Sequence, residues 1–253
     1  MQIWAGPCAI ESEKQAMQIA KEVARYEGVI FRGGAYKGQN RPIVKGKPCF
    51  WGLGEEGLQI LHRIKQVFGI QVSTEVQSVE QLKLALDYGI DYLQVGARHM
   101  QNFPLIRALS YVQRPIILKR GLGNTVDEWL GIAEHLRANG NKDVIMCERG
   151  VSSFDRTNDT RWRLDCLAIA EIKYQYPHYK VIADVSHGTG RRELALPMAK
   201  AAKGAGADGI MVELHYDPDS SPTDGRQTVN FDQFKQIMES TTDWIYIHEG
   251  HTL

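Results

Sequence analysis

The chain has 253 residues, 43% of them hydrophobic, and its 30 Lys and Arg residues balance 30 Asp and Glu residues. This length suffices for one large core, and the zero net charge excludes a general attraction to nucleic acid or to an anionic membrane. The four cysteines are too sparse for a disulfide framework, and no signal-peptide or membrane-spanning pattern is found, so we expect a cytoplasmic protein.

Short β-branched runs alternate with amphipathic helical runs along the chain. The predicted strands cover residues 2–8, 29–36, 70–76, 91–98, 115–121, 143–150, 180–188 and 209–215. The predicted helices cover 12–26, runs that begin at 55 and 78, and then 104–112, 126–139, 164–174, 192–203 and 231–240. Eight such units predict an α/β fold, a single (β/α)8 TIM barrel. An open doubly wound sheet is the alternative, but the first predicted strand is not followed by a Gly-rich dinucleotide turn.

Polar side chains end all eight predicted strands, and the active site of a barrel lies at this end. In chain order they are Cys8, Arg32, Lys37, Glu75, Arg98, Lys119, Arg120, Glu148, Arg149, Asp184, His187, Glu213 and His215. Each of them taken alone is more simply a structural or solvated group. Because four strands supply a cation to one mouth, the set predicts a pocket for a multiply charged anion, such as a phosphorylated carboxylate.

A second group of residues combines a thiol, an imidazole and two carboxylates. Its members are Cys8, His187, Glu213 and, in the loop after the eighth strand, Asp224. Cys8 alone is more simply a small buried hydrophobe, and His187 alone is equally well a hydrogen-bonded residue. Strands one, seven and eight adjoin once the barrel closes, so the four side chains are expected to converge. This donor set favours a divalent transition metal over Mg²⁺ or Ca²⁺, which prefer oxygen ligands.

Ten short motifs follow one another along the chain: GPCAIES, FRGGAYK, GLGEEGL, STEV, VGARHMQN, LKRG, CERG, DVSHGTGRRE, GADGIMVELH and DGRQTVNFDQF. Taken in this order, they resemble the motifs of the type I-beta 3-deoxy-D-arabino-heptulosonate 7-phosphate (DAHP) synthases. They extend from about Ile3 to Phe234, and the related 3-deoxy-D-manno-octulosonate 8-phosphate synthases share many of them. The resemblance implies a transferase that condenses phosphoenolpyruvate with erythrose 4-phosphate and releases phosphate, the first step of the shikimate pathway and of aromatic amino acid biosynthesis.

The resemblance also implies a role for each matching position. The implied ligands of a divalent transition metal (Mn, Fe, Co or Zn) are Cys8, His187, Glu213 and Asp224. The implied phosphoenolpyruvate ligands are Arg98, Lys119 and Arg149. Arg32 and Lys37 would lie between the two substrates, with Lys37 as a candidate proton donor. Glu75 and Asp184 match family positions close to the reacting centre.

The loop that would contact the aldose phosphate departs from the family pattern. Synthases that make the heptulosonate usually carry Lys-Pro-Arg-Thr, whereas this chain reads Lys37 and Gly38 followed by Gln39, Asn40, Arg41 and Pro42. The octulosonate synthases usually carry Lys-Ala-Asn-Arg-Ser, and an Asn-Arg pair occurs here one place later. An octulosonate synthase, or a synthase for another phosphorylated aldose, is therefore the first alternative. The second alternative is a non-catalytic phosphosugar-binding barrel, although every ligand and cation position is filled.

Chain length and family likeness set the remaining expectations. Many members of this branch carry a ferredoxin-like or chorismate mutase domain, which 253 residues could not also hold. We therefore expect one catalytic domain over residues 1–253, without a regulatory domain and without feedback inhibition by aromatic amino acids. The resemblance further implies a homodimer or homotetramer, with phosphoenolpyruvate and an aldose phosphate as its small-molecule partners.

Overall fold

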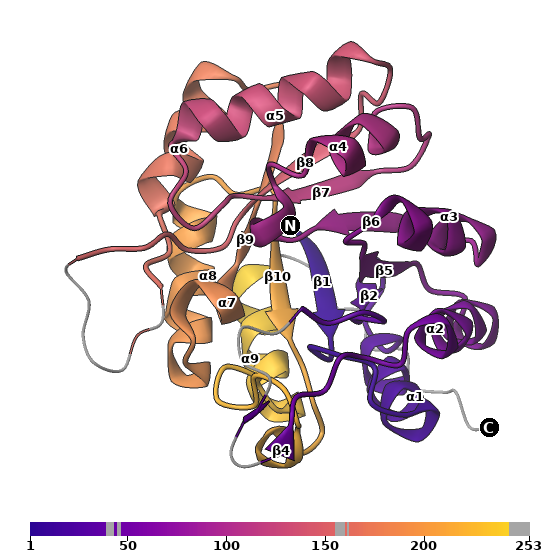
Figure 1. Ribbon diagram of the computed structural model, residues 1–253. Helices are drawn as coiled ribbons and strands as arrows, with labels where there is room; N and C mark the ends of the chain where they lie inside the picture. The colour runs from indigo at the N-terminus through magenta and orange to yellow at the C-terminus, as the bar shows by residue number, and fades with distance from the viewer. Residues whose placement is uncertain (39–42, 45–46, 155–159, 161, 243–253) are drawn as a thin grey trace.

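The computed structural model describes residues 1–38, 43–44, 47–154, 160 and 162–242. Eight parallel strands close into a barrel in the order β1-β10-β9-β8-β7-β6-β5-β2, and helices surround it (Figure 1). The barrel strands are β1 (Gln2–Gly6), β2 (Ile30–Arg32), β5 (Val72–Glu75), β6 (Tyr92–Val95), β7 (Ile116–Lys119), β8 (Val144–Glu148), β9 (Lys180–Asp184) and β10 (Gly209–Glu213). The predicted (β/α)8 TIM barrel is confirmed. No helix in the described ranges is both long and apolar enough to cross a membrane.

The outer helices are α1 (Glu13–Val23), α2 (Glu55–Phe68), α3 (Val79–Asp87), α4 (Phe103–Leu109), α5 (Val126–Ala138), α6 (Cys166–Gln175), α8 (Ala195–Gly204) and α9 (Phe231–Thr241). Most outer helices begin at a capping side chain, whereas α2 and α8 begin after Gly54 and Leu194 without one. The predicted cap Ser78 accepts a hydrogen bond from the Gln81 backbone N–H, and Thr125 and Asn230 each form a full capping box. Caps at these positions turn the chain from a strand end into the following helix.

The main differences from the predicted elements lie at the strand ends. The strand predicted over 180–188 ends at Asp184, whose carboxylate accepts a hydrogen bond from the His187 N–H at 2.9 Å and so caps the short helix α7 (Val185–Thr189). His187 therefore lies on a helix and not on a strand. Arg98 likewise lies on the 3-10 turn η1 (Ala97–His99). The long loop after β2 contains a small hairpin, β3 (Ile43–Val44) and β4 (Lys47–Pro48), which hydrophobic periodicity does not reveal.

Two separate apolar clusters fill the structure. The larger cluster lies between the strands and the helices. The smaller cluster draws its buried members from strand residues alone: Trp4, Ile30, Ile117, Ile145, Cys147, Ile182 and Met211. On each strand these residues alternate with members of the larger cluster, so they point into the barrel and form the floor beneath its mouth.

Gly6 shows how closely the carboxyl ends of β1 and β2 approach each other at the mouth. Its φ is +152°, and a Cβ atom there would lie 2.0 Å from the carbonyl oxygen of Arg32. Gly6→Ala is therefore expected to lower the free energy of unfolding by about 2–3 kcal/mol, because backbone must move. Gly131→Ala, inside α5 with open space around it, should raise this free energy by about 0.5–1 kcal/mol. Urea denaturation measures both changes, and equal effects would contradict the account.

Candidate active site at the barrel mouth

Strand geometry directs the functional side chains into the mouth. Side chains two residues apart on a strand point to the same side, so the residue two places after a floor residue lies above it. Ile117, Ile182 and Met211 of the floor are followed in this way by Lys119, Asp184 and Glu213. The same spacing places Arg32 above Ile30 and Arg149 above Cys147. The polar layer thus stands directly on an apolar floor.

The four predicted metal ligands lie together. One donor atom from each of Cys8, His187, Glu213 and Asp224 falls within 4.8 Å of the other three. The Cys8 Sγ lies 3.2 Å from Asp224 Oδ2, and His187 Nε2 lies 3.4 Å from Glu213 Oε1 and 3.9 Å from Asp224 Oδ2. Donors that share one tetrahedral ion at about 2.1 Å stand roughly 3.4 Å apart. Both the spacing and the sulfur, nitrogen and oxygen donors fit a divalent transition metal.

Other buried side chains orient two of these donors. The His187 Nδ1 lies 2.9 Å from Asp184 Oδ2, which turns Nε2 toward the cluster. Burial lowers the pKa of His187 and so favours the neutral imidazole that a metal requires. Gln227, itself buried, donates a hydrogen bond to Glu213 Oε2 at 2.7 Å and leaves Oε1 facing His187.

Lys37 contacts two of the four predicted ligands directly. Its Nζ lies 2.5 Å from Cys8 Sγ and 3.2 Å from Asp224 Oδ2. Burial opposes the charge of Lys37, but Cys8 and Asp224 outweigh it and raise the pKa of this amine, so the amine stays protonated. Burial, together with the charge of Glu213, raises the pKa of the Cys8 thiol. A bound cation would instead lower the pKa of the Cys8 thiol, because a coordinating thiol is deprotonated.

Three further predicted cations are buried in the same layer, and one is exposed. Arg32 donates to the Pro7 carbonyl at 2.8 Å and lies 3.4 Å from Glu213 Oε1. Lys119 forms a buried ion pair with Asp184 at 2.6 Å. Arg149 is buried with its guanidinium 5.5 Å from the centre of the Trp162 ring. Arg98, by contrast, is exposed on η1, and the predicted aldose-binding residues Gln39, Asn40 and Arg41 lie outside the described residues.

Glu75 and Asp184 are both charged carboxylates in this arrangement. Burial would raise the pKa of Glu75, but the charges of Lys119 and Lys37 outweigh it and hold this pKa below its usual value. Burial likewise opposes the charge of Asp184, while His187 and Lys119 hold its pKa well below the usual range. Gln94 and Gln77 donate to the two oxygens of Glu75 at 2.9 and 3.3 Å. Neither carboxylate is therefore suited to be the proton donor.

Two strand-end residues, Arg120 and Glu148, turn away from the mouth. Arg120 pairs with Glu148 at 3.2 Å and with Asp165 at 2.9 Å, which ties β7 and β8 to the start of α6. Strand alternation predicts this outward orientation, because Arg120 and Glu148 each neighbour an inward-pointing residue.

The contact between Gln227 and Glu213 is not evident from the sequence. Gln227 follows Asp224 by only three places in DGRQ, but no spacing rule indicates that it contacts Glu213.

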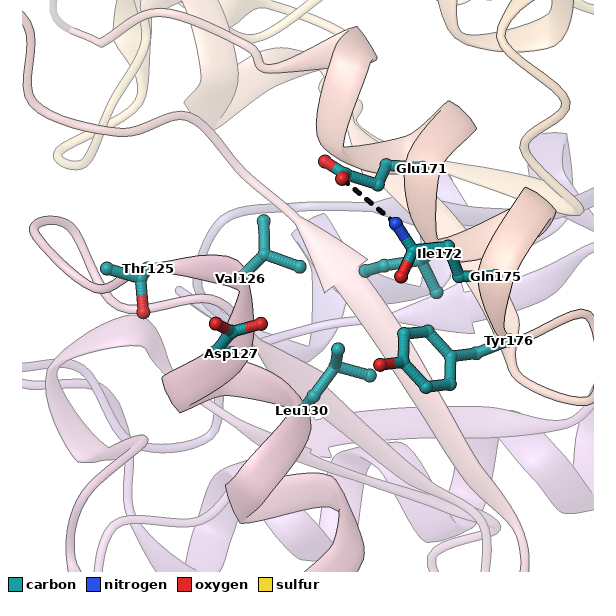
Figure 2. Close-up of a pocket in the computed structure, with 8 residues that line it drawn as sticks. All are labelled: Thr125, Val126, Asp127, Leu130, Glu171, Ile172, Gln175 and Tyr176. Atoms are coloured by element: carbon teal, nitrogen blue, oxygen red, sulfur yellow. Dashed lines mark hydrogen bonds between the residues drawn. The ribbon is translucent and has the colours of Figure 1, made fainter.

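A cavity of about 230 Å³ lies elsewhere, between α5 and α6. Figure 2 shows Val126 and Leu130 on one side of it and Ile172 and Tyr176 on the other, with the carboxylates of Asp127 and Glu171 at its rim. It contains none of the residues predicted for the site. Two carboxylates would repel a phosphorylated acid, so this cavity is a poor place for such a substrate.

The closed barrel and its polar mouth place the chain among (β/α)8 proteins with a site at the carboxyl ends of the strands. The family described as the DAHP synthetase I family matches residues 1–246. The chain belongs to this family.

Solved structures and other relatives agree with this assignment. A crystal structure of the phospho-2-dehydro-3-deoxyheptonate aldolase (DAHP synthase) of Thermotoga maritima has a TM-score of 0.87 and 37% identity, over 95% of this chain and 68% of that one. A truncated form of the 3-deoxy-D-arabino-heptulosonate 7-phosphate synthase from T. maritima has a TM-score of 0.84 and 36% identity, over 94% of this chain and 84% of that one. The 2-dehydro-3-deoxyphosphooctonate aldolase of Granulibacter bethesdensis is 31% identical, over 92% of this chain and 85% of that protein.

Proposed function

We propose that the protein is a metal-dependent DAHP synthase, which condenses phosphoenolpyruvate with erythrose 4-phosphate to give DAHP and phosphate. The observation that carries this proposal is the meeting of four metal-donor atoms within 4.8 Å, directly beside the protonated amine of Lys37. Family membership supports the reaction class. The proposed ligands are Cys8, His187, Glu213 and Asp224, and Mn, Fe, Co or Zn would each suit these donors.

In the proposed reaction, C3 of phosphoenolpyruvate attacks the aldehyde carbon, water adds at C2, and phosphate leaves. Lys119 and Arg149, with Arg98 at the rim, would bind the phosphate and carboxylate groups and hold C3 toward the aldehyde. A bound divalent metal would supply Lewis-acid polarisation of the aldehyde oxygen. Lys37, which contacts the proposed ligand Cys8, would donate its proton to that oxygen as it becomes a hydroxyl.

The remaining charged residues would keep these groups in place. Asp184 accepts from Lys119 and faces the His187 ring, so a single carboxylate fixes both the substrate-binding amine and the metal-binding imidazole. Arg32 lies beside Glu213, where it would add positive charge between the two substrates. Glu75 would retain its negative charge near Lys119 and Lys37 and so limit how strongly the mouth holds a released anion.

Arg98→Ala is expected to raise KM for phosphoenolpyruvate by about tenfold, because a charge-assisted hydrogen bond at an exposed position contributes about 1.5 kcal/mol. Arg107→Ala is the matched control, since Arg107 is also an exposed arginine but lies at the end of α4. Steady-state kinetics at saturating aldose phosphate give both values. An unchanged KM in Arg98→Ala would remove this residue from the substrate site.

The identity of the aldose substrate has one specific alternative. The 31% identity to an octulosonate enzyme, together with the Asn40-Arg41 pair, favours arabinose 5-phosphate as the alternative substrate. Phosphate release should be measured in parallel with erythrose 4-phosphate and with arabinose 5-phosphate. We expect kcat/KM to be higher for erythrose 4-phosphate, and a preference for arabinose 5-phosphate would assign the octulosonate reaction instead.

We further propose that the protein acts in the cytoplasm as a homodimer or homotetramer, with one catalytic domain and no regulatory domain over residues 1–253. The family resemblance supports this assembly. Sedimentation equilibrium measures the mass of the assembly, and turnover assays with added Phe or Tyr test for feedback inhibition.

A further inference from the structure

The loop that follows β10 holds the metal-donor residue Asp224 in a strained backbone conformation. Asp224 has a φ of +51°, and it is the non-glycine residue with a positive φ among the described residues. This left-handed conformation costs about 1–2 kcal/mol for most side chains, although Asp tolerates it better than most. Such a conformation persists only where neighbouring contacts determine it. The contacts that hold this loop therefore decide where the Asp224 carboxylate lies.

Some of these contacts come from the loop itself. The Asp224 carbonyl accepts from the Gln227 N–H at 3.0 Å and from the Thr228 hydroxyl at 3.1 Å. Gly225 packs so closely on Pro218 that a Cβ atom would lie 2.2 Å from the Pro218 carbonyl oxygen. These contacts shape the turn, but none of them fixes it to the rest of the barrel.

Gln227 bonds the end of the turn to Glu213 of β10, and Arg192 connects its first residues to the segment after α7. Arg192 lies on the 3-10 turn η2 (Arg192–Leu194), which comes shortly after the helix that carries His187. Its guanidinium donates to the Gly225 carbonyl at 2.6 Å and to Asp219 at 2.5 Å, and its backbone N–H donates to the Arg226 carbonyl at 3.0 Å. Arg192 thus binds the two residues immediately after Asp224 with two separate donors. Its side chain is only 19% exposed.

We propose that Arg192 is a positioning residue for the metal site: it holds the 224–226 turn so that the Asp224 carboxylate reaches the other three donors. This inference rests on the metal site of the proposed function. Arg192 has no contact with the donor atoms themselves in the hydrogen bonds and ion pairs described above, so it acts through Asp224. Loss of a residue that orients a ligand typically lowers metal affinity by about 10–100-fold.

The experiment measures Co²⁺ affinity of the apoprotein by the thiolate-to-cobalt absorption band, with a competing chelator as reference. Arg192→Ala is expected to weaken Co²⁺ binding by about 10–100-fold. Arg191→Ala is the matched control, because the adjacent Arg191 pairs instead with the exposed Glu193, and it should bind Co²⁺ as the unsubstituted protein does. Arg192→Lys, which cannot reproduce both guanidinium contacts, should fall between the two. The unfolding midpoint of each apoprotein separates a local effect from a loss of fold.

A double-mutant cycle with Asp224→Ala separates positioning from a general structural role. If Arg192 acts through Asp224, adding Arg192→Ala to Asp224→Ala should weaken Co²⁺ binding no further. Additive losses, or an Arg192→Ala affinity within twofold of the unsubstituted protein, would overturn the inference while leaving the metal site in place. Absence of Co²⁺ binding by the unsubstituted protein would overturn both this inference and the proposed function.

Discussion

Cys8→Ala is expected to lower phosphoenolpyruvate-dependent phosphate release by about a thousandfold or more while leaving the barrel folded. The thiol is one of four donors that meet within 4.8 Å, and a three-ligand remnant of carboxylates and imidazole would hold a transition metal less tightly. A thousandfold loss corresponds to about 4 kcal/mol of lost transition-state stabilisation, within the range that a Lewis acid supplies. Initial rates at saturating substrates, with circular dichroism to check the fold, measure this effect.

Cys166→Ala is the control for this substitution. Cys166 is half-buried at the start of α6, away from the four donors, so its removal should leave the rate unchanged. Full activity in metal-stripped Cys8→Ala would show that turnover does not depend on a metal held by this thiol. Equal losses in the two cysteine variants would show that the effect is not specific to the ligand cluster.

Lys37→Met is expected to lower kcat by about 10²–10⁴-fold, the usual contribution of a positioned general acid. In the metal-free protein, burial opposes the charge of Lys37, but Cys8 and Asp224 outweigh it and raise the pKa of this amine, so it carries a proton to donate. Pre-steady-state rates at saturating substrates measure the loss of kcat.

Lys235→Met, an exposed lysine on α9, serves as the control and should leave kcat unchanged. A Lys37→Met variant that altered KM alone would show that Lys37 binds substrate and does not donate the proton. Retention of full kcat would remove Lys37 from the reaction.

Much of this architecture can be predicted from the sequence because it follows from periodic patterns. Alternating strands and helices predict the closed barrel, and the barrel in turn predicts that residues as distant as Cys8 and Asp224 meet. Side-chain alternation along β7 also separates Lys119, which faces the mouth, from Arg120, which faces Asp165. Regular strands and helices therefore allow side-chain directions, and meetings of distant residues, to be predicted from the sequence.

Contacts between irregular segments cannot be predicted in this way. The placement of His187 on a short helix depends on a local cap by Asp184, and the sequence of residues 180–188 is equally compatible with a longer strand. The contacts of Gln227 with Glu213 and of Arg192 with Gly225 join segments whose separation obeys no period. The first contact orients the Glu213 carboxylate, and the second is the one through which we propose that Arg192 positions Asp224.

We propose that a divalent metal and the phosphoenolpyruvate-binding cations act together at one barrel mouth. The most direct measurement is phosphate release from phosphoenolpyruvate and erythrose 4-phosphate by chelator-treated protein, before and after Mn²⁺ is restored. We expect negligible phosphate release without metal, recovery with Mn²⁺, and no release when either substrate is omitted. Undiminished release by the fully metal-free protein, or no release after metal is restored, would contradict this proposal.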